Sequence, residues 1–284
     1  MSVLEAEAGA RGPRPAHIVA TVPRPTLLAQ ISDLHLGAAW EGVDPTPRLE
    51  AVIAAIQGLP NEVDAVLVSG DLTDDGGVDA CLRAREILDR FEVPVYVLPG
   101  NHDDRACLRE TFELPGVGGE PIDYVAEVGE LRLLVLDSAV PGQDPGGFDP
   151  ERLDWLDAEL ARESQRPTLL AMHHPPLATG VPEWDAINLL AAEREALARV
   201  VARHPQLRVV VGGHLHRVAF SSLAGCAVFS APSTYLQARP DFAPADFAAE
   251  DVGLVGSPGF ALHVLLDGEL SSQVEMVDLN GLGV

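Results

Sequence analysis

The hydrophobic positions in the first hundred residues predict alternating strands and helices. Short apolar, β-branched runs predict buried strands at Leu27 to Ile31, Ala65 to Ser69 and Val93 to Leu98. Between them, apolar residues recur at helical spacing. This spacing predicts a helix that begins at Thr46-Pro47, with Thr46 as its N-cap, and a second helix near Asp79 to Phe91. Strands that alternate with helices in this way imply a parallel sheet with crossover helices.

The later part of the chain mixes two kinds of connection. Two apolar runs that flank Gly129-Glu130 predict a β-hairpin, and helices are expected from Asp149-Pro150 and from about Leu190 to Arg203. The expected strands are Tyr124 to Val128, Leu131 to Leu136, Thr168 to Met172, Val209 to Val211, Val218 to Ser222, Ala227 to Ser230, Phe260 to Leu266 and Ser272 to Val277. Parallel and antiparallel strands together predict an α/β fold in which two mixed sheets pack together with helices outside.

The chain shows no repeat or low-complexity boundary that would divide it. Residues 1–25 are rich in Ala, Gly, Arg and Pro and are expected to form a flexible arm. Residues 26–284 are expected to form a single domain. The Pro- and Asp-rich stretch from Ala238 to Pro258 is interpreted as a long surface loop whose function the sequence leaves open.

Composition and charge narrow the classes of function. With 19 Lys+Arg against 43 Asp+Glu the formal net charge is -24, which argues against binding to a nucleic-acid polymer or to anionic lipid. Cys81, Cys107 and Cys226 show no CxxC spacing, so a disulfide framework and a thiolate metal site are both disfavoured and a cytoplasmic location is expected. No secretory signal pattern and no apolar run of about 20 residues is present, so no membrane span is expected.

Polar side chains with metal-ligand chemistry follow five of the predicted strands. These segments are Asp33-Leu34-His35, Gly70-Asp71, Gly100-Asn101-His102-Asp103, His173-His174 and Gly213-His214-Leu215-His216. In an extended chain residues i and i+2 point the same way, so Asp33 and His35 are expected to reach one metal. His214 and His216 would do the same, with Leu215 toward the core. Because strand carboxyl ends gather at one sheet edge, the sequence predicts a two-metal phosphoesterase site there.

These segments resemble a known family pattern. Asp33-x-His35, Gly70-Asp71-Leu72-Thr73-Asp74, Gly100-Asn101-His102-Asp103, His173-x-Pro175 and Gly213-His214-x-His216 are similar, in order, to the five blocks of the calcineurin-like metallophosphoesterases. The resemblance covers about Thr26 to Leu266 and is closest to the bacterial class III cyclic-nucleotide (cAMP) phosphodiesterases. It implies a four-layer α/β/β/α sandwich.

The resemblance also implies a role for each residue. Asp33, His35, Asp71 and His216 would hold one metal, and Asp71, Asn101, His173 and His214 would hold the other, with Asp71 as the bridge. His102 would act as donor or general acid, Asp74 would orient its ring, and Asn101 and His102 would contact the substrate. Mixed nitrogen and oxygen ligands fit two transition metal ions, with Mn, Fe or Zn favoured over Ca or Mg.

The expected reaction is hydrolysis of a small phosphodiester by a hydroxide that bridges the two metals. The substrate would be 3′,5′-cAMP or a 2′,3′-cyclic nucleotide; the alternative is a glycerophosphodiester or a broader range of small phosphomonoesters and diesters. A catalytically inactive scaffold is disfavoured because all ligand types are present. His174 is left between a pocket-lining and a turn-capping role, and His204 and His263 are not expected to be ligands. Trp155 and Trp184 are interpreted as packing residues. Oligomeric state stays open, with a homodimer as one alternative because dimers are common in the family.

Overall fold

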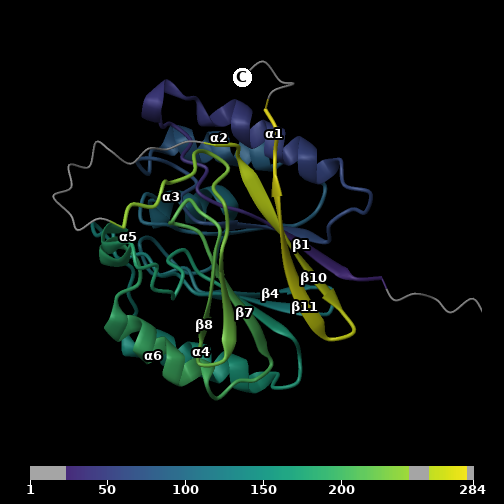
Figure 1. Ribbon diagram of the computed structural model, residues 1–284, viewed down its shortest axis with the longest axis vertical. Coiled ribbons are helices and arrows are strands. Elements are labelled where there is room, and N and C mark those ends of the chain that lie inside the picture. Colours follow the sequence, from purple (N-terminus) through teal and green to yellow (C-terminus); the bar gives the residue numbers. More distant parts are fainter. Residues whose placement is uncertain (1–23, 243–255, 280–284) are drawn as a thin grey trace, which may run out of the picture.

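The computed structural model describes residues 24–242 and 256–279, and within them two β-sheets pack face to face (Figure 1). The expected arm at residues 1–25 and the expected loop from Ala238 to Pro258 lie mostly outside the described residues. The first sheet has the strand order β11-β10-β1-β2-β3 and the second has the order β4-β5-β6-β7-β9-β8.

The strands run Thr26–Ile31 (β1), Ala65–Ser69 (β2), Val95–Leu98 (β3), Tyr124–Val128 (β4), Leu131–Val135 (β5), Thr168–Ala171 (β6), Leu207–Gly212 (β7), Ala219–Leu223 (β8), Cys226–Ser230 (β9), Gly259–Leu266 (β10) and Glu269–Met276 (β11). The helices run Pro45–Gln57 (α1), Val78–Leu88 (α2), Arg105–Phe112 (α3), Pro150–Arg162 (α4), Pro182–Ile187 (α5) and Ala191–Val201 (α6), with a 3-10 turn at Trp40–Gly42 (η1).

Both sheets are mixed, as predicted. Strands β1, β2 and β3 are parallel, and β10 and β11 extend that sheet with antiparallel pairs. In the second sheet β5, β6, β7 and β9 are parallel, whereas β4 and β8 form antiparallel edges. The central strands are buried on both faces because each sheet has another sheet on one side and helices on the other.

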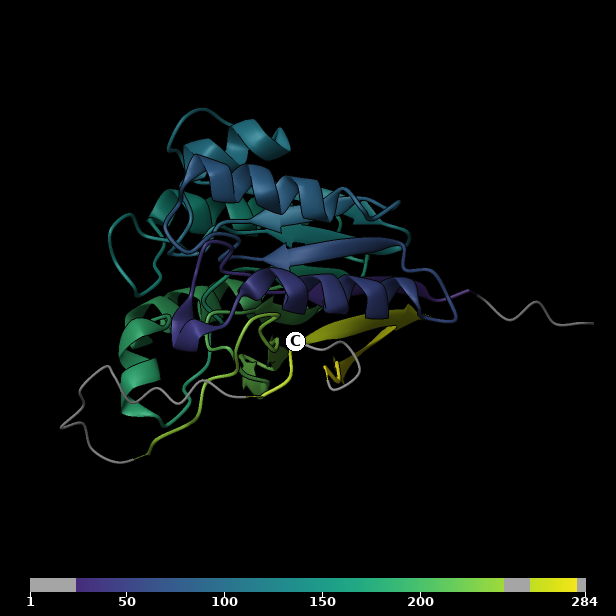
Figure 2. The ribbon, with the colours of Figure 1, turned by 90° about the horizontal axis from the view of Figure 1, so that it is seen from above.

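Three apolar layers hold the sandwich together. The layer between the sheets contains Leu28, Leu67, Leu133, Leu169 and Phe229. Side chains from α1 and α2 pack on the outer face of the first sheet, and side chains from α4 and α6 pack on the outer face of the second. Helices therefore lie outside two packed sheets, which confirms the expected α/β/β/α order (Figures 1 and 2).

One expectation about helices is wrong, and two short helices, α3 and α5, were missed. Helix α1 begins at Pro45 rather than at Thr46-Pro47, because Asp44 is its N-cap and the Asp44 carboxylate accepts a hydrogen bond from the Thr46 amide. Helix α3 was not predicted. It is only eight residues long, it follows an Asp104 N-cap, and it buries two arginines, Arg105 and Arg109, together with Leu108.

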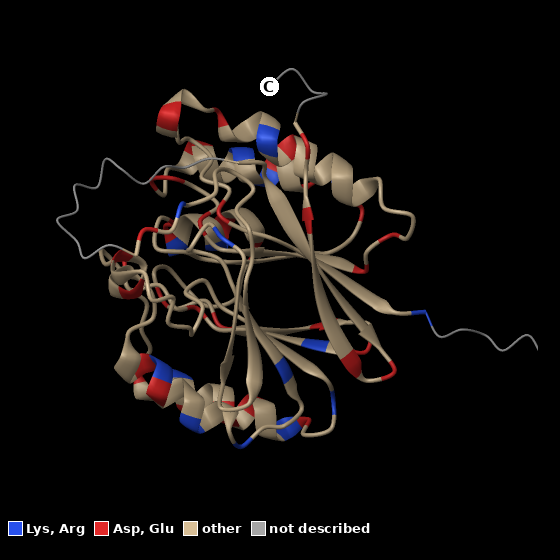
Figure 3. Cartoon of the chain, viewed as in Figure 1, with Lys and Arg blue, Asp and Glu red and all other residues tan. Residues whose placement is uncertain are grey.

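The distribution of charge follows this architecture. Charged side chains lie mainly on helices and loops, whereas the packed strands carry few of them (Figure 3). Within the described part of the chain, no helix combines the length and the apolar character that crossing a membrane would need. Cys81, Cys107 and Cys226 are free thiols.

Candidate metal centre

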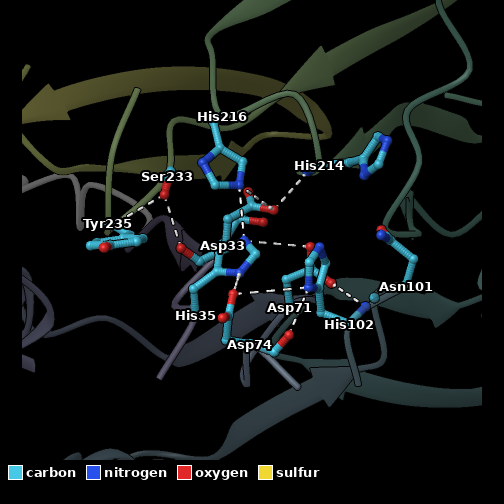
Figure 4. A network of polar contacts seen from close by, with 12 residues as sticks. Asp33, His35, Asp71, Asp74, Asn101, His102, His214, His216, Ser233 and Tyr235 are labelled. Atoms are coloured by element: carbon cyan, nitrogen blue, oxygen red, sulfur yellow. Dashed lines mark hydrogen bonds and ion pairs between the residues drawn. The ribbon is translucent and has the colours of Figure 1, made fainter. Parts of the chain in front are cut away.

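The predicted site residues converge at one edge of the sandwich. The parallel strands of both sheets end there. Asp33 and His35 follow β1, Asp71 follows β2, Asn101 and His102 follow β3, His173 follows β6, and His214 and His216 follow β7. Figure 4 shows Asp33, His35, Asp71, His102 and His216 turned toward one another.

The backbone of these loops is not extended, contrary to the sequence-based argument about residues i and i+2. Five of the predicted ligands have left-handed backbone conformations, with φ of 54° at Asp33, 45° at His35, 50° at Asp71, 65° at His214 and 47° at His216. Such conformations cost roughly 1–3 kcal/mol each in non-glycine residues and persist where the surroundings determine them. Their concentration at one edge is typical of a functional site.

Backbone contacts between segments hold these strained loops in place. The Asp33 amide donates to the Gly70 carbonyl at 3.1 Å, and the His35 amide donates to the Asp71 carbonyl at 2.9 Å. The His214 amide donates to Asp33 Oδ1 at 2.9 Å, which joins the two sheets. The loops therefore support one another across the sandwich.

The first group of predicted ligands is Asp33, His35 and His216. Their ligand atoms lie within 4.8 Å of one another, and His35 Nε2 lies 3.0 Å from His216 Nε2. Asp33 is fully buried, and its Oδ2 atom has no hydrogen-bond partner. A buried carboxylate oxygen without a partner is costly. Two facing imidazole nitrogens and this oxygen together fit a cation.

The second group surrounds Asp71. His173 Nε2 lies 3.2 Å from Asp71 Oδ2 and 3.1 Å from Asn101 Oδ1. His35 Nε2 approaches the same Asp71 Oδ2 at 3.6 Å, so Asp71 lies between the two groups. The His214 ring lies 5.0 Å from the His173 ring, centroid to centroid. Asp71 thus occupies the position that a bridging ligand needs.

Each histidine of the site has one ring nitrogen within hydrogen-bond distance of an oxygen on the protein. His173 Nδ1 faces the Ser69 carbonyl at 2.9 Å, His216 Nδ1 faces the Leu236 carbonyl at 2.9 Å, and His214 Nε2 faces the Ile187 carbonyl at 3.0 Å. Such acceptors place the proton on that nitrogen and leave the other one free to bind a metal. The donor set therefore fits a pair of transition metals.

His174 differs from its neighbour. Its Nδ1 contacts Ser138 Oγ and its Nε2 contacts the Asp144 carbonyl, both at 2.9 Å, so both ring nitrogens are occupied. The ring is buried between the strand ends and the loop that carries Asp144. His173 and His174 both lie in a group with His214 that could hold a metal ion, but His173 Nε2 faces Asp71 and Asn101, whereas both nitrogens of His174 have other partners. His204 and His263 lie elsewhere, paired with Asp157 and with Gln30 and Ser272.

Asp74 contacts two histidines, in different ways. Its backbone carbonyl accepts from His102 Nδ1 at 2.8 Å, whereas its carboxylate Oδ1 lies 3.2 Å from His35 Nδ1 and 4.0 Å from His102 Nδ1. The His102 ring is therefore oriented by the Asp74 main chain. The carboxylate that was expected to orient His102 is closer to the predicted ligand His35.

The electrostatics match these contacts. Burial alone would raise the pKa of Asp71, but the charges of His173, His35 and His102 and the hydrogen bond from His173 hold this pKa well below its usual range. Burial would lower the pKa of His102, but the Asp71 charge and the hydrogen bond to Asp74 raise it. Burial lowers the pKa of His216 to about 4 and the pKa of His214 well below its usual value, so both rings are neutral, as metal ligands must be. Burial would also lower the pKa of His173, but the Asp71 charge raises it to about 9, so His173 would have to lose a proton when it binds a metal.

A cavity of about 540 Å³ opens onto the site. Besides predicted ligands, it is lined by Trp40, Glu41, Asp144, Glu183, Trp184, Ile187, Leu215 and Ala238. Most of these were missed in the sequence, because they lie in loops and in the short helix α5. No pattern in the sequence singled out Trp40, which lies five residues after His35 and just before α1. Leu215 is buried in the core, as expected.

Comparison with known proteins agrees with this geometry. The family model described as calcineurin-like phosphoesterase matches residues 26–218. The chain is 30% identical to the 3′,5′-cyclic adenosine monophosphate phosphodiesterase CpdA of Pseudomonas aeruginosa, over 89% of this chain and 90% of that protein. It is 33% identical to a probable glycerophosphodiester phosphodiesterase GpdQ of Arcobacter nitrofigilis, over 79% and 85%.

A solved structure shares the fold. A dimetal phosphatase from Danio rerio aligns over 90% of this chain and all of its own, with a TM-score of 0.62 and 18% identity. The family match and the curated relatives, together with the clusters of histidine and aspartate at the strand ends, establish the class of enzyme. The chain belongs to the calcineurin-like phosphoesterase family and is a metal-dependent phosphoric ester hydrolase.

Proposed function

We propose that this protein is a binuclear phosphodiesterase that hydrolyses a small cyclic nucleotide, 3′,5′-cAMP or a 2′,3′-cyclic nucleotide. The observation that carries the proposal is the unpartnered Asp33 Oδ2, which is buried in the cluster where His35 Nε2 and His216 Nε2 face each other, beside Asp71. The similarity to a protein named as a cAMP phosphodiesterase supports the choice of substrate.

We assign the seven ligands as the family resemblance implies. One metal is held by Asp33, His35, Asp71 and His216, and the other by Asp71, Asn101, His173 and His214. Two metal ions held by these residues would supply activation of water at neutral pH and neutralisation of charge on the phosphate. We propose Mn, Fe or Zn, because each metal would have a mixed set of nitrogen and oxygen ligands.

His102 supplies the remaining chemistry. Its Nδ1 donates to the Asp74 carbonyl, and its side chain is 35% exposed at the cavity. Burial would lower its pKa, but the Asp71 charge and the hydrogen bond to Asp74 raise it overall, which favours a second proton at Nε2. From there it donates to a phosphate oxygen or protonates the leaving alkoxide. The Asn101 amide contacts the substrate phosphate from the same loop.

The second candidate is a glycerophosphodiester, which is favoured by the similarity to a protein named GpdQ. We further propose that residues from 26 onward form one domain and that the protein acts in the cytoplasm. The three free thiols are consistent with a reducing compartment.

Hydrolysis rates on a substrate panel test the proposal. With Mn added, 3′,5′-cAMP or 2′,3′-cAMP should be cleaved faster than glycerophosphocholine and p-nitrophenyl phosphate. The Asp71→Ala protein is the control for activity that depends on the metal site. Cleavage of p-nitrophenyl phosphate alone would refute the diesterase assignment, and a preference for glycerophosphocholine would favour the second candidate.

A further inference from the structure

The wall of the cavity beside the metal centre is partly aromatic. Trp40 lines the cavity, is partly buried, and lies next to three histidines of the site. Its ring centroid is 4.4 Å from that of His35 and 6.2 Å from that of His102. It is stacked near His216, with centroids 5.8 Å apart and planes at 22°. A group attached to a phosphate held between these histidines would therefore meet the indole.

The backbone that carries Trp40 is held firmly. The Tyr235 hydroxyl lies 3.1 Å from the Trp40 carbonyl and 2.8 Å from the Val43 carbonyl, and Tyr235 itself is fully buried. Glu41, the next residue, has a left-handed backbone with φ of 54°. The indole itself packs against the rings of His35 and Tyr235, with centroids 4.4 and 5.4 Å away, so it is placed before any substrate binds, which lowers the entropy cost of ordering it.

The charges in the cavity restrict what this wall can accept. Glu41, Asp144 and Glu183 line the cavity, and of the residues that line it within the described ranges none is Arg or Lys. A second anionic group on the substrate would meet like charges there. A neutral, flat group avoids this repulsion and can stack on an indole face, which contributes about 1–3 kcal/mol for a nucleobase.

We propose that Trp40 is a specificity-determining residue that stacks against the nucleobase of the substrate. The inference rests on the proposed phosphodiesterase function and adds to it the side chain that recognises the group beyond the phosphate. A cavity of about 540 Å³ is within the usual range for small-molecule sites. Helix α5, through Trp184 and Ile187, lines the same cavity.

The experiment compares two product-like competitors of equal phosphate charge. Adenosine 5′-monophosphate and glycerol 3-phosphate are tested as inhibitors of bis(p-nitrophenyl) phosphate hydrolysis by Mn-loaded enzyme. In Trp40→Leu the inhibition constant for the nucleotide should rise about 5- to 150-fold, the equivalent of the stacking energy. The constant for glycerol 3-phosphate should change less than twofold. Trp40→Phe should keep most of the nucleotide affinity, and Trp155→Leu, on α4 outside the cavity, should match wild type.

Tryptophan fluorescence supplies a readout that is independent of activity. Adenosine 5′-monophosphate should quench wild-type emission, and most of the quenching should be lost in Trp40→Phe, where Trp184 is the one cavity-lining tryptophan that remains among the described residues. Equal weakening of both competitors in Trp40→Leu, or a loss of bound Mn, would overturn the proposal by showing that the indole only shields His35 and His216. If wild type cleaves no diester, the proposed function fails, and the fluorescence titration still decides whether Trp40 stacks on the base.

Discussion

Replacement of Asp74 by Asn tests whether the Asp74 side chain supports His35, as the structure indicates, or His102, as the sequence suggests. The carboxylate Oδ1 is 3.2 Å from His35 Nδ1, whereas His102 Nδ1 is held by the Asp74 backbone carbonyl at 2.8 Å. The substitution removes the charge behind a predicted metal ligand but keeps the main-chain contact to His102. Metal affinity should therefore fall while the chemical step is preserved.

The magnitude follows from the kind of contact that is weakened. Loss of a partner that orients a metal-binding histidine typically costs about 10- to 100-fold in metal affinity. Because an Asn oxygen can still accept from His35 Nδ1, Asp74→Asn should lie near 10-fold and Asp74→Ala near 100-fold. Asp75→Asn is the matched control, since the exposed Asp75 carboxylate accepts, among the described residues, only from the Gly77 amide.

The assay is a titration of chelator-stripped protein with Mn. Binding is measured by calorimetry, and activity is measured at each Mn concentration. Asp74→Asn should shift the titration midpoint about 10-fold and leave kcat at saturating Mn within about twofold of wild type. An unchanged midpoint combined with a large fall in kcat would refute this reasoning. It would mean that the Asp74 carboxylate acts through His102 despite the 4.0 Å separation.

Four further predictions follow from named contacts. Asp71→Asn should remove both metals, whereas His102→Gln should keep both metals and lose about 10²- to 10⁴-fold in rate. Elemental analysis and kcat measure these two effects. Metal loss in His102→Gln would contradict the assignment. Gly100→Ala should lower Tm by several degrees, because an added Cβ would overlap the Asp71 side chain and amide. Gly119→Ala is the control and should be neutral, since its Cβ would meet nothing within 4 Å. Equal Tm values for the two variants would disprove the close packing at Gly100. Burial lowers the pKa of His263 to about 3, so below about pH 6.5 the unfolded chain binds a proton that the folded chain does not. The free energy of unfolding should therefore fall as pH drops from 6.5 toward 3, by up to about 1.4 kcal/mol per pH unit. In chemical denaturation, His263→Gln should flatten this slope. Removal of metal with a chelator should lower Tm, because bound Mn stabilises the folded state in proportion to the logarithm of the ratio of free Mn to its Kd. An unchanged Tm would argue against tight binding in the folded state.

The sequence predicted the layered fold well, because buried parallel strands leave long apolar runs that periodicity detects. It also identified the segments that meet at the strand ends, since metal ligands there break those runs abruptly. The ends of helices were less predictable: Asp44 and Thr46 are both good N-cap residues, and only the structure shows that the Asp44 carboxylate is the one used.

The local geometry of the site could not be predicted in the same way. Side-chain alternation assumes extended backbone, whereas Asp33, His35, His214 and His216 have left-handed conformations, and contacts from other loops, one of them between the two sheets, accompany these conformations. The contacts of Asp74 were also unpredictable. A sequence motif identifies the residue but does not show whether its carboxylate or its backbone carbonyl contacts His102. Trp40 lies outside every ligand block, and only the fold brings it next to His35.

The central claim is that two cations share Asp71 at the edge of the sandwich. An anomalous-scattering map of crystals grown with Mn tests it most directly. The account predicts two peaks about 3.5–4 Å apart on either side of the Asp71 carboxylate, with Asp33 Oδ2 bound to one of them. A single peak, or peaks from which Asp71 or Asp33 is absent, would contradict it.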